Sequence, residues 1–238
     1  MSTSVSNSNS TSQTTQTFCV LEKTKNCVSN LYQTIHDVVM KIIKTIGECF
    51  EACKSSVPKI FTKTEAPDPK NIVAFYLCLE PNENHITIDE ILRQNDDALE
   101  SGHNYIQWLF PLETKSRSYS NAPILDRATI KRFRNDGALQ LHLERCFARM
   151  LDFYGLRMDV NTLTISRAQN FNSRAAVWLT TDNHNFLRIS RIIHSVGLLG
   201  LPNHSRAFLN IMQDIAQNEG AGIVNEANLR FWRGACIS

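Results

Sequence analysis

The densest run of aromatic and apolar side chains in this sequence reads His103-Asn104-Tyr105-Ile106-Gln107-Trp108-Leu109-Phe110-Pro111. Three large rings lie within six consecutive positions. Burial of one aromatic side chain removes roughly 150–250 Å² of surface from water. Because the residue before a proline is disfavoured in the α region, a helix in this run should end near Phe110. We therefore predict a short buried helix, with Gln107 hydrogen-bonded inside it and His103 at its edge.

Composition limits the range of functions. The chain has 238 residues, of which 42% are hydrophobic and 20% charged, and its net charge is +2. This length suits one sizeable domain with extensions. Nucleic-acid binding would need a local basic patch beside exposed aromatic rings, and the rings here are expected to be buried, so a nucleic-acid partner is disfavoured. The seven cysteines lack the paired spacing of a zinc site, which indicates a reducing compartment without a disulfide framework.

The N-terminal residues 1–17 are almost entirely Ser, Thr, Asn and Gln, which predicts a disordered tail. No basic region followed by an apolar run is present, so an ordinary secretory signal is not expected. Another interpretation is that the tail is a non-cleaved export signal of a secreted effector. No stretch approaches the roughly 18–20 apolar residues of a membrane span, and we expect a soluble protein.

Residues 27–54 carry apolar side chains three and four positions apart, which predicts an amphipathic helix with heptad spacing. Such a helix can pack against protein, self-associate as a coiled coil or scaffold, or lie on a membrane surface as a peripheral contact. Residues 55–70 contain three prolines among polar residues and are predicted to be a linker.

The remaining chain predicts a single all-α globular domain over residues 71–219, followed by a C-terminal extension over 220–238. The predicted helices cover residues 72–79, 88–99, 105–110, 130–134, 139–154, 171–179, 184–196 and 205–216, and residues 156–166 predict a loop or a small hairpin. Thr87 and Glu90 have the spacing of a capping box, Asp126 is a suitable N-cap, and Gly155 is placed to end a helix.

The helix over 184–196 combines an apolar stripe with a basic one. We expect Asn183 to cap it and Leu187, Ile192, Ile193 and Val196 to form much of its buried stripe. Ser205 is then expected to cap the next helix.

Known catalytic patterns find little support. The sequence has no phosphate-binding glycine loop and no nucleophile elbow, and Cys146 lies in the middle of an apolar helix, where a thiol is usually inert. His103, His184 and His194 lack the spacing of a helical zinc motif. A metal-dependent enzyme that assembles these three histidines in space stays as an alternative. The leading expectation is a non-enzymatic protein without a cofactor or metal.

Arginines are concentrated in the C-terminal half. Five fall within 35 residues, namely Arg157, Arg167, Arg174, Arg188 and Arg191. Guanidinium groups bind carboxylates and phosphates through two parallel hydrogen bonds, so a pocket for an anion or an acidic peptide is one interpretation. A solvated face with structural ion pairs is the other. His184, Arg188 and Arg191 are spaced i, i+4 and i+7, which places them on one helix face.

Three segments together resemble a known family. The run His103–Pro111, with Leu99-Glu100 ahead of it, is similar to the signature of the opioid growth factor receptor conserved region. Met150–Gly155 resembles the second motif of that family, and His184–Ile192 resembles the third, with Ser190 where threonine is usual. The resemblance implies an all-helical domain and a receptor that binds an enkephalin pentapeptide, with a nuclear, perinuclear or membrane-associated location. It brings no catalytic residues.

These observations predict the residues of a ligand site. The proposed peptide-binding residues are His103, Tyr105, Gln107, His184, Arg188 and Arg191, and the proposed anion-binding residues are Arg157, Arg167 and Arg174. The expected partner is a peptide or another anionic molecule.

Overall fold

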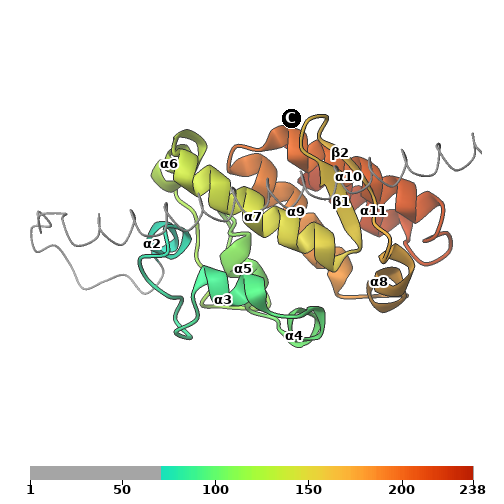
Figure 1. Ribbon diagram of the computed structural model, residues 1–238, viewed down its shortest axis with the longest axis horizontal. Helices are drawn as coiled ribbons and strands as arrows, with labels where there is room; N and C mark the ends of the chain where they lie inside the picture. Colours follow the sequence, from blue (N-terminus) through green and yellow to red (C-terminus); the bar gives the residue numbers. More distant parts are fainter. Residues whose placement is uncertain (1–70, 238) are drawn as a thin grey trace, which may run out of the picture. The chain divides into compact units, whose positions relative to one another are not determined.

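The computed structural model describes residues 71–237, in which helices predominate and one two-stranded sheet is present (Figure 1). The all-α prediction for this part of the chain is confirmed. The predicted tail 1–17, amphipathic helix 27–54 and linker 55–70 lie outside the described residues, as do the self-association and membrane contact assigned to the helix. Between residues 71 and 237, no helix is both long and apolar enough to cross a membrane.

The domain begins with four short helices. They are α2 (Ile72–Tyr76), α3 (Ile88–Arg93), α4 (Asp96–Ser101) and α5 (Tyr105–Leu109). The capping box is confirmed, because Thr87 accepts from the Glu90 amide while the Glu90 carboxylate accepts from the Thr87 amide. The single helix predicted over 88–99 is wrong. Asn95 accepts from the Ala98 amide at 2.8 Å and starts α4 as a new helix.

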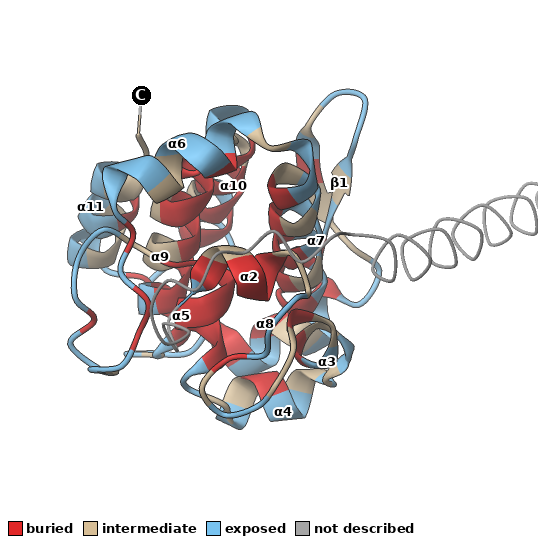
Figure 2. Cartoon of the chain, turned by 90° about the vertical axis from the view of Figure 1, so that its left-hand side faces the viewer, coloured by how far each residue is buried: buried red, intermediate tan, exposed pale blue. Residues whose placement is uncertain are grey.

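The aromatic run forms the buried helix that its sequence predicts. Every residue of α5 is buried, and the helix ends at Leu109 with Phe110 as its C-cap. The Trp108 ring packs 5.1 Å from the Phe75 ring of α2, and the Tyr76 hydroxyl donates to the Leu109 carbonyl. Figure 2 shows α2 and α5 as red, buried segments among the surrounding helices. This packing anchors the N-terminal helices to the core.

The next two helices are α6 (Arg127–Asn135) and α7 (Gly137–Phe153). Asp126 accepts from the Thr129 amide at 2.7 Å, so its predicted role as an N-cap is confirmed. Helix α7 buries one stripe of its surface, which comprises Leu139, Leu143, Cys146, Phe147, Met150, Leu151 and Phe153. It contacts α2, α6, α9 and the sheet, and it therefore connects the two halves of the domain.

Gly155 ends this part of the chain with a φ of +73°, as predicted for a helix-terminating glycine. A Cβ atom there would lie 2.7 Å from the Phe171 Cα. The chain then forms an antiparallel hairpin from β1 (Leu156–Asp159) and β2 (Thr164–Arg167), with Arg157 opposite Ser166. The sequence predicted either a loop or a small hairpin here, and the structure contains the hairpin.

The last helices are α8 (Phe171–Trp178), α9 (Asn185–Leu198), α10 (Pro202–Gln217) and α11 (Glu226–Ala235). The N-cap position of α9 is His184 rather than the expected Asn183, whose side chain accepts from the Asn185 amide at 2.9 Å. Two other expectations are also wrong. Leu187 is 69% exposed, and Phe186 and Ile189 are buried in its place. Ser205 does not cap α10, which starts at Pro202; its hydroxyl donates to the Ile193 carbonyl at 2.7 Å.

Helix α11 lies within the segment predicted to be an extension, and it docks on α9. Trp232 is buried, its ring lies 5.9 Å from the Phe186 ring, and its Nε1 donates to the Phe186 carbonyl at 2.9 Å. The neighbouring Phe231 is 64% exposed. One side of α11 is therefore part of the domain core.

Candidate functional site

The first and third sequence motifs meet where Arg188 of α9 contacts the end of α4 and the Tyr105 ring of α5. Arg188 Nη2 donates to the carbonyl oxygens of Gly102 at 2.5 Å and Glu100 at 3.2 Å, and its Nη1 donates to the Leu99 carbonyl at 3.2 Å. The guanidinium also lies 5.4 Å from the centre of the Tyr105 ring. A cation suits a helix C-terminus because unpaired carbonyls face outward there. The buried Arg188 thus caps α4 and fixes the approach to α5.

Two arginines, Arg149 just before the second motif and Arg174 of α8, hold the other end of α4. Asp96, in the first turn of α4, lies 2.8 Å from Arg149 of α7 and 3.2 Å from Arg174 of α8. Arg149 also donates to the Gln94 carbonyl, and Arg174 donates to the Phe153 carbonyl, both at 2.8 Å. Three arginines from three helices therefore set the position of a six-residue helix.

His103 and His184 lie close together beside the C-terminal end of α4. Their ring centroids are 5.7 Å apart, and His184 Nε2 lies 3.3 Å from a carboxylate oxygen of Glu100. Asn185 donates to both oxygens of the same carboxylate. Burial lowers the pKa of His184, and the nearby Arg188 lowers it further, against the opposing effect of Glu100. His184 is therefore neutral at pH 7, and His103 is exposed to solvent.

A surface pocket of about 330 Å³ opens next to His103. Its walls come from the loop after α2, from α3 and from the start of α5, and they comprise Asn82, Asn84, Ile86, Ile91, Gln94, Gly102, His103, Asn104 and Tyr105. The buried Asn82 shapes the loop, because its side chain accepts from the amides of Asn84 and Ile86, each at 3.0 Å. The pocket is thus lined by four carboxamides, one imidazole and two isoleucine side chains. None of the lining residues is an acid, a lysine or an arginine.

The structure places the other predicted ligand residues of the first motif inside the domain. Tyr105 is 7% exposed, and burial raises the pKa of its phenol to about 12. Gln107 is 4% exposed, and its amide nitrogen, when turned toward the preceding turn, donates to the carbonyls of His103 and Asn104 at 2.9 and 3.0 Å. Of these two side chains, Tyr105 borders the pocket, while Gln107 holds the first turn of α5.

Arg191 lies on the same side of α9 as Arg188, one turn further along. Its Nη1 donates to the Phe110 carbonyl at 3.1 Å, and Ser195 donates to the Pro111 carbonyl at 2.8 Å. The α9 face that the spacing predicted therefore runs along both ends of the aromatic helix. Its side chains donate hydrogen bonds to backbone carbonyls there. The spacing alone did not reveal these contacts.

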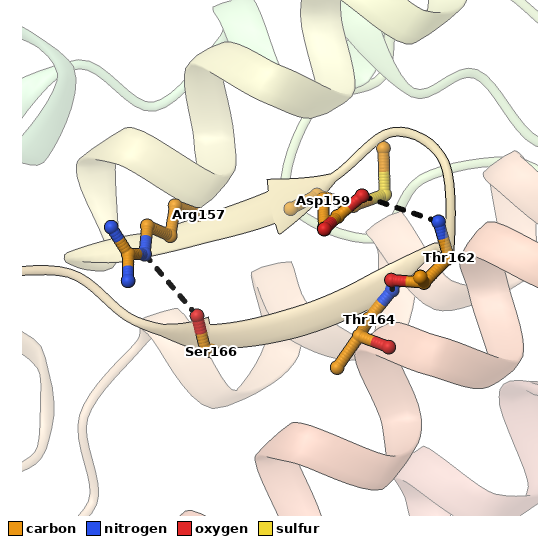
Figure 3. A pocket seen from close by; sticks show the side chains of 6 residues that line it. Arg157, Asp159, Thr162, Thr164 and Ser166 are labelled. Carbon is orange, nitrogen blue, oxygen red and sulfur yellow. Dashed lines mark hydrogen bonds between the residues drawn. The ribbon is translucent and has the colours of Figure 1, made fainter.

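The structure does not gather Arg157, Arg167 and Arg174 at one anion site, because each has separate partners. Arg167 pairs with Glu219 at 2.6 Å and Asp214 at 2.8 Å, and Arg174 pairs with Asp96. Arg157 lies on the hairpin, where it faces Ser166 across the strands (Figure 3). It borders an open hollow of about 600 Å³ lined by Arg157, Met158, Asp159, Thr162, Thr164 and Ser166.

The structure separates His194 from the other two histidines of the metal alternative. His194 lies ten residues after His184, which is about 15 Å along a helix at 1.5 Å per residue. Its ring contacts Glu113 and the Ala235 carbonyl, each at 3.2 Å. Three imidazoles spread over this distance cannot bind one ion, so the shared three-histidine site is wrong.

Sequence reasoning missed two parts of this region. Asp96 is not among the residues predicted for the site, yet it is the carboxylate shared by Arg149 and Arg174. Asn82 and Asn84 were also absent from the predicted site, because polar residues after an apolar helix are typical of an ordinary loop. The two asparagines flanking Glu83 were the available signal, since Asn side chains often organise tight turns.

Comparisons with known proteins match the chain to the family that its three sequence motifs resemble. Residues 64–235 match the sequence model of the opioid growth factor receptor (OGFr) conserved region. The chain is 38% identical over 139 residues to a Mus musculus protein named opioid growth factor receptor, an alignment that covers 56% of this chain and 21% of the mouse protein. It is 42% identical over 118 residues to the Homo sapiens protein of the same name, covering 48% and 17% of the two chains.

A Xenopus tropicalis protein named opioid growth factor receptor-like protein 1 is 31% identical over 150 residues, covering 61% of this chain and 29% of that protein. The chain therefore aligns with less than a third of the length of each of these relatives. No solved structure matches it significantly.

Proposed function

Because this chain belongs to the opioid growth factor receptor family, we propose that it is a non-enzymatic receptor-type module that binds a peptide in the pocket beside His103. The receptor names of its relatives point in general to a ligand or protein partner. The single observation that carries the proposal is the 330 Å³ pocket built against the aromatic helix.

The chemistry of the pocket favours a peptide. A carboxamide side chain both donates and accepts, as does a peptide unit, so Asn84, Gln94 and Asn104 offer matching groups for a peptide backbone. Ile86 and Ile91 provide an apolar wall for one side chain. Small-molecule sites commonly combine such apolar walls with a few polar groups at volumes of roughly 300–1,000 Å³.

The buried thiol of Cys146 is not a candidate nucleophile. Cys146 lies within α7 at 0% exposure, and burial raises its pKa to about 12. A nucleophilic cysteine needs a thiolate that substrate can reach, and Cys146 meets neither condition. Within residues 71–237, no group of three His, Cys, Asp or Glu side chains is arranged to hold a metal ion.

Calorimetric titration of the full chain with an enkephalin pentapeptide tests the proposal. We expect saturable heat, and we expect His103→Ala and Asn104→Ala each to weaken binding by about tenfold, the effect of losing one good hydrogen bond. His142→Ala, on α7, is the matched control and should leave the affinity unchanged. Arg188 is unsuitable as a probe because it caps α4. Absence of heat, or equal losses in His103→Ala and the control, would contradict the proposal.

A further inference from the structure

Helix α6 presents a positively charged face to solvent. Four of its nine residues are basic and exposed, namely Arg127, Lys131, Arg132 and Arg134. Figure 2 shows α6 as a mostly pale blue segment on the outside of the domain. Arg127, Lys131 and Arg134 are spaced i, i+4 and i+7, which places them along one side of the helix. The chain as a whole has a net charge of only +2, so its positive charge is concentrated here.

Nearby carboxylates leave most of this charge unpaired. The acidic residues that flank α6 are Asp126 and Asp136, which cap the N-termini of α6 and α7. Arg132 lies 3.9 Å from Asp136 in an exposed i, i+4 pair. Within residues 71–237, neither Arg127 nor Lys131 has a carboxylate oxygen within 4 Å. The α6 face is therefore complementary to a partner with closely spaced negative charges.

The composition of the α6 face indicates which anionic partner fits. A docked protein segment buries an apolar core, and a membrane-bound helix inserts large apolar side chains. The described structure shows no exposed large apolar side chain on α6, and the nearest one before it in the sequence is Ile124. Single-stranded nucleic acid stacks its bases on exposed rings, whereas Phe133, the one ring of α6, is buried. A nucleic-acid duplex needs neither feature, because its backbone is bound through charge.

The spacing of the four cations suits double-stranded DNA. Residues 127–134 span about 10 Å at 1.5 Å per residue, and duplex DNA carries one negative charge per roughly 1.7 Å of its axis. The major groove of DNA admits an α-helix, whereas that of an RNA duplex is too narrow to be read by side chains. The expectation from the sequence against a nucleic-acid partner depended on exposed rings, which duplex binding does not require.

We propose that the exposed face of α6 binds the phosphate backbone of double-stranded DNA without sequence preference. Arg127, Lys131 and Arg134 contact phosphates along one side of the helix, and Arg132 contributes a fourth contact. The proposal does not use the pocket beside His103. It adds a second activity to the proposed function, and it is tested separately.

The salt dependence of binding measures the number of phosphate contacts. Full-length protein is titrated into a fluorescently labelled DNA duplex, and the anisotropy gives the affinity at several salt concentrations. For four contacts, we expect the affinity to fall about 100-fold between roughly 50 and 200 mM salt, which is a slope of about −3.6 on logarithmic axes. A second duplex of the same length and unrelated sequence should bind equally well.

Matched variants locate the contacts. Arg127→Gln/Lys131→Gln should weaken binding and make the slope shallower by about two, because each lost phosphate contact removes about one. Arg93→Gln/Arg230→Gln removes the same charge from exposed positions of α3 and α11 and should leave the slope unchanged. Ile124→Ala should also bind as the wild type does. Thermal melts establish that each variant is folded, and if the α6 double variant unfolds, its two single variants decide.

A slope near zero, or a slope that is unchanged in the α6 variants, would overturn the proposal. Tighter binding of a thymidine single strand than of the duplexes would overturn it in favour of a single-strand site. Binding to phosphatidylserine vesicles that is lost in Ile124→Ala, without binding to either duplex, would overturn it in favour of a membrane contact.

Discussion

Arg188 of α9 donates to the Gly102 carbonyl at the end of α4, across 86 residues of sequence. The contact joins the third motif of the family to the first. It places His184 beside His103, and it orients the loop that forms one wall of the candidate pocket. Arg188, predicted from the sequence to bind a ligand, is instead buried and positions the backbone beside the site.

Replacement of Arg188 should be costly for stability. Arg188→Ala removes hydrogen bonds to three backbone carbonyls and leaves these groups without a donor. We expect the free energy of unfolding to fall by about 3 kcal/mol, since a hydrogen bond to a charged group contributes roughly 1.5–3 kcal/mol. Urea denaturation measures the change. Arg230→Ala, an exposed arginine of α11, should stay within about 0.5 kcal/mol of the wild type. Similar values for both variants would contradict the capping role.

Gly155 should not tolerate alanine. Its φ of +73° disfavours any side chain, and a Cβ would meet the Phe171 backbone at 2.7 Å. We expect Gly155→Ala to cost about 2–4 kcal/mol, of which about 1–2 kcal/mol comes from the left-handed conformation. Gly222 has a φ of +79° with open space around it. Gly222→Ala therefore measures the cost of the left-handed conformation alone. Equal losses in the two variants would show that the close approach to α8 contributes nothing.

The adjacent residues Trp232 and Phe231 test whether α11 belongs to the domain. Trp232→Ala should lower the free energy of unfolding by about 3–5 kcal/mol, the usual cost of truncating a buried large aromatic residue. Phe231→Ala should change it by less than about 0.5 kcal/mol, because Phe231 is 64% exposed. Chemical denaturation provides both values. A small effect of Trp232→Ala would mean that α11 is not docked in solution.

Stability should decrease below neutral pH because of His204. Burial against Phe147 lowers the pKa of His204 below its ordinary value of 6.5, with a smaller opposing effect of Glu144. The unfolded chain therefore takes up a proton more readily than the folded one, so the stability present above pH 6.5 is lost as the pH falls through the lowered pKa. Denaturation at pH 7.5 and pH 5 should show a smaller loss in His204→Gln than in the wild type. An equal loss would exclude His204 as a source of the pH dependence.

Local features were the ones that the sequence predicted well. The capping box at Thr87, the Asp126 cap and the Gly155 terminus each depend on residues within a few positions of one another. The aromatic run also predicted its own burial and its end near Phe110. The break between α3 and α4 was missed because Asn95 competes as a cap inside an otherwise helical pattern.

Long-range features needed the structure. Periodicity placed Arg188 on a polar stripe, and only the position of α4 shows that this stripe faces backbone carbonyls. For the same reason the sequence could not tell Arg174, paired with Asp96, from Arg191, which has no carboxylate partner in the described residues. The pocket combines a loop, α3 and α5, and its carboxamides share no sequence spacing that could reveal it.

The most direct test of the proposed peptide site is an NMR map of the full chain titrated with the enkephalin pentapeptide. The account predicts that the amide signals of Asn84, Gly102, His103 and Asn104 shift together and saturate at one peptide per chain, while the signals of α10 stay in place. Saturable shifts confined to other surfaces, or no shifts at millimolar peptide, would contradict the account.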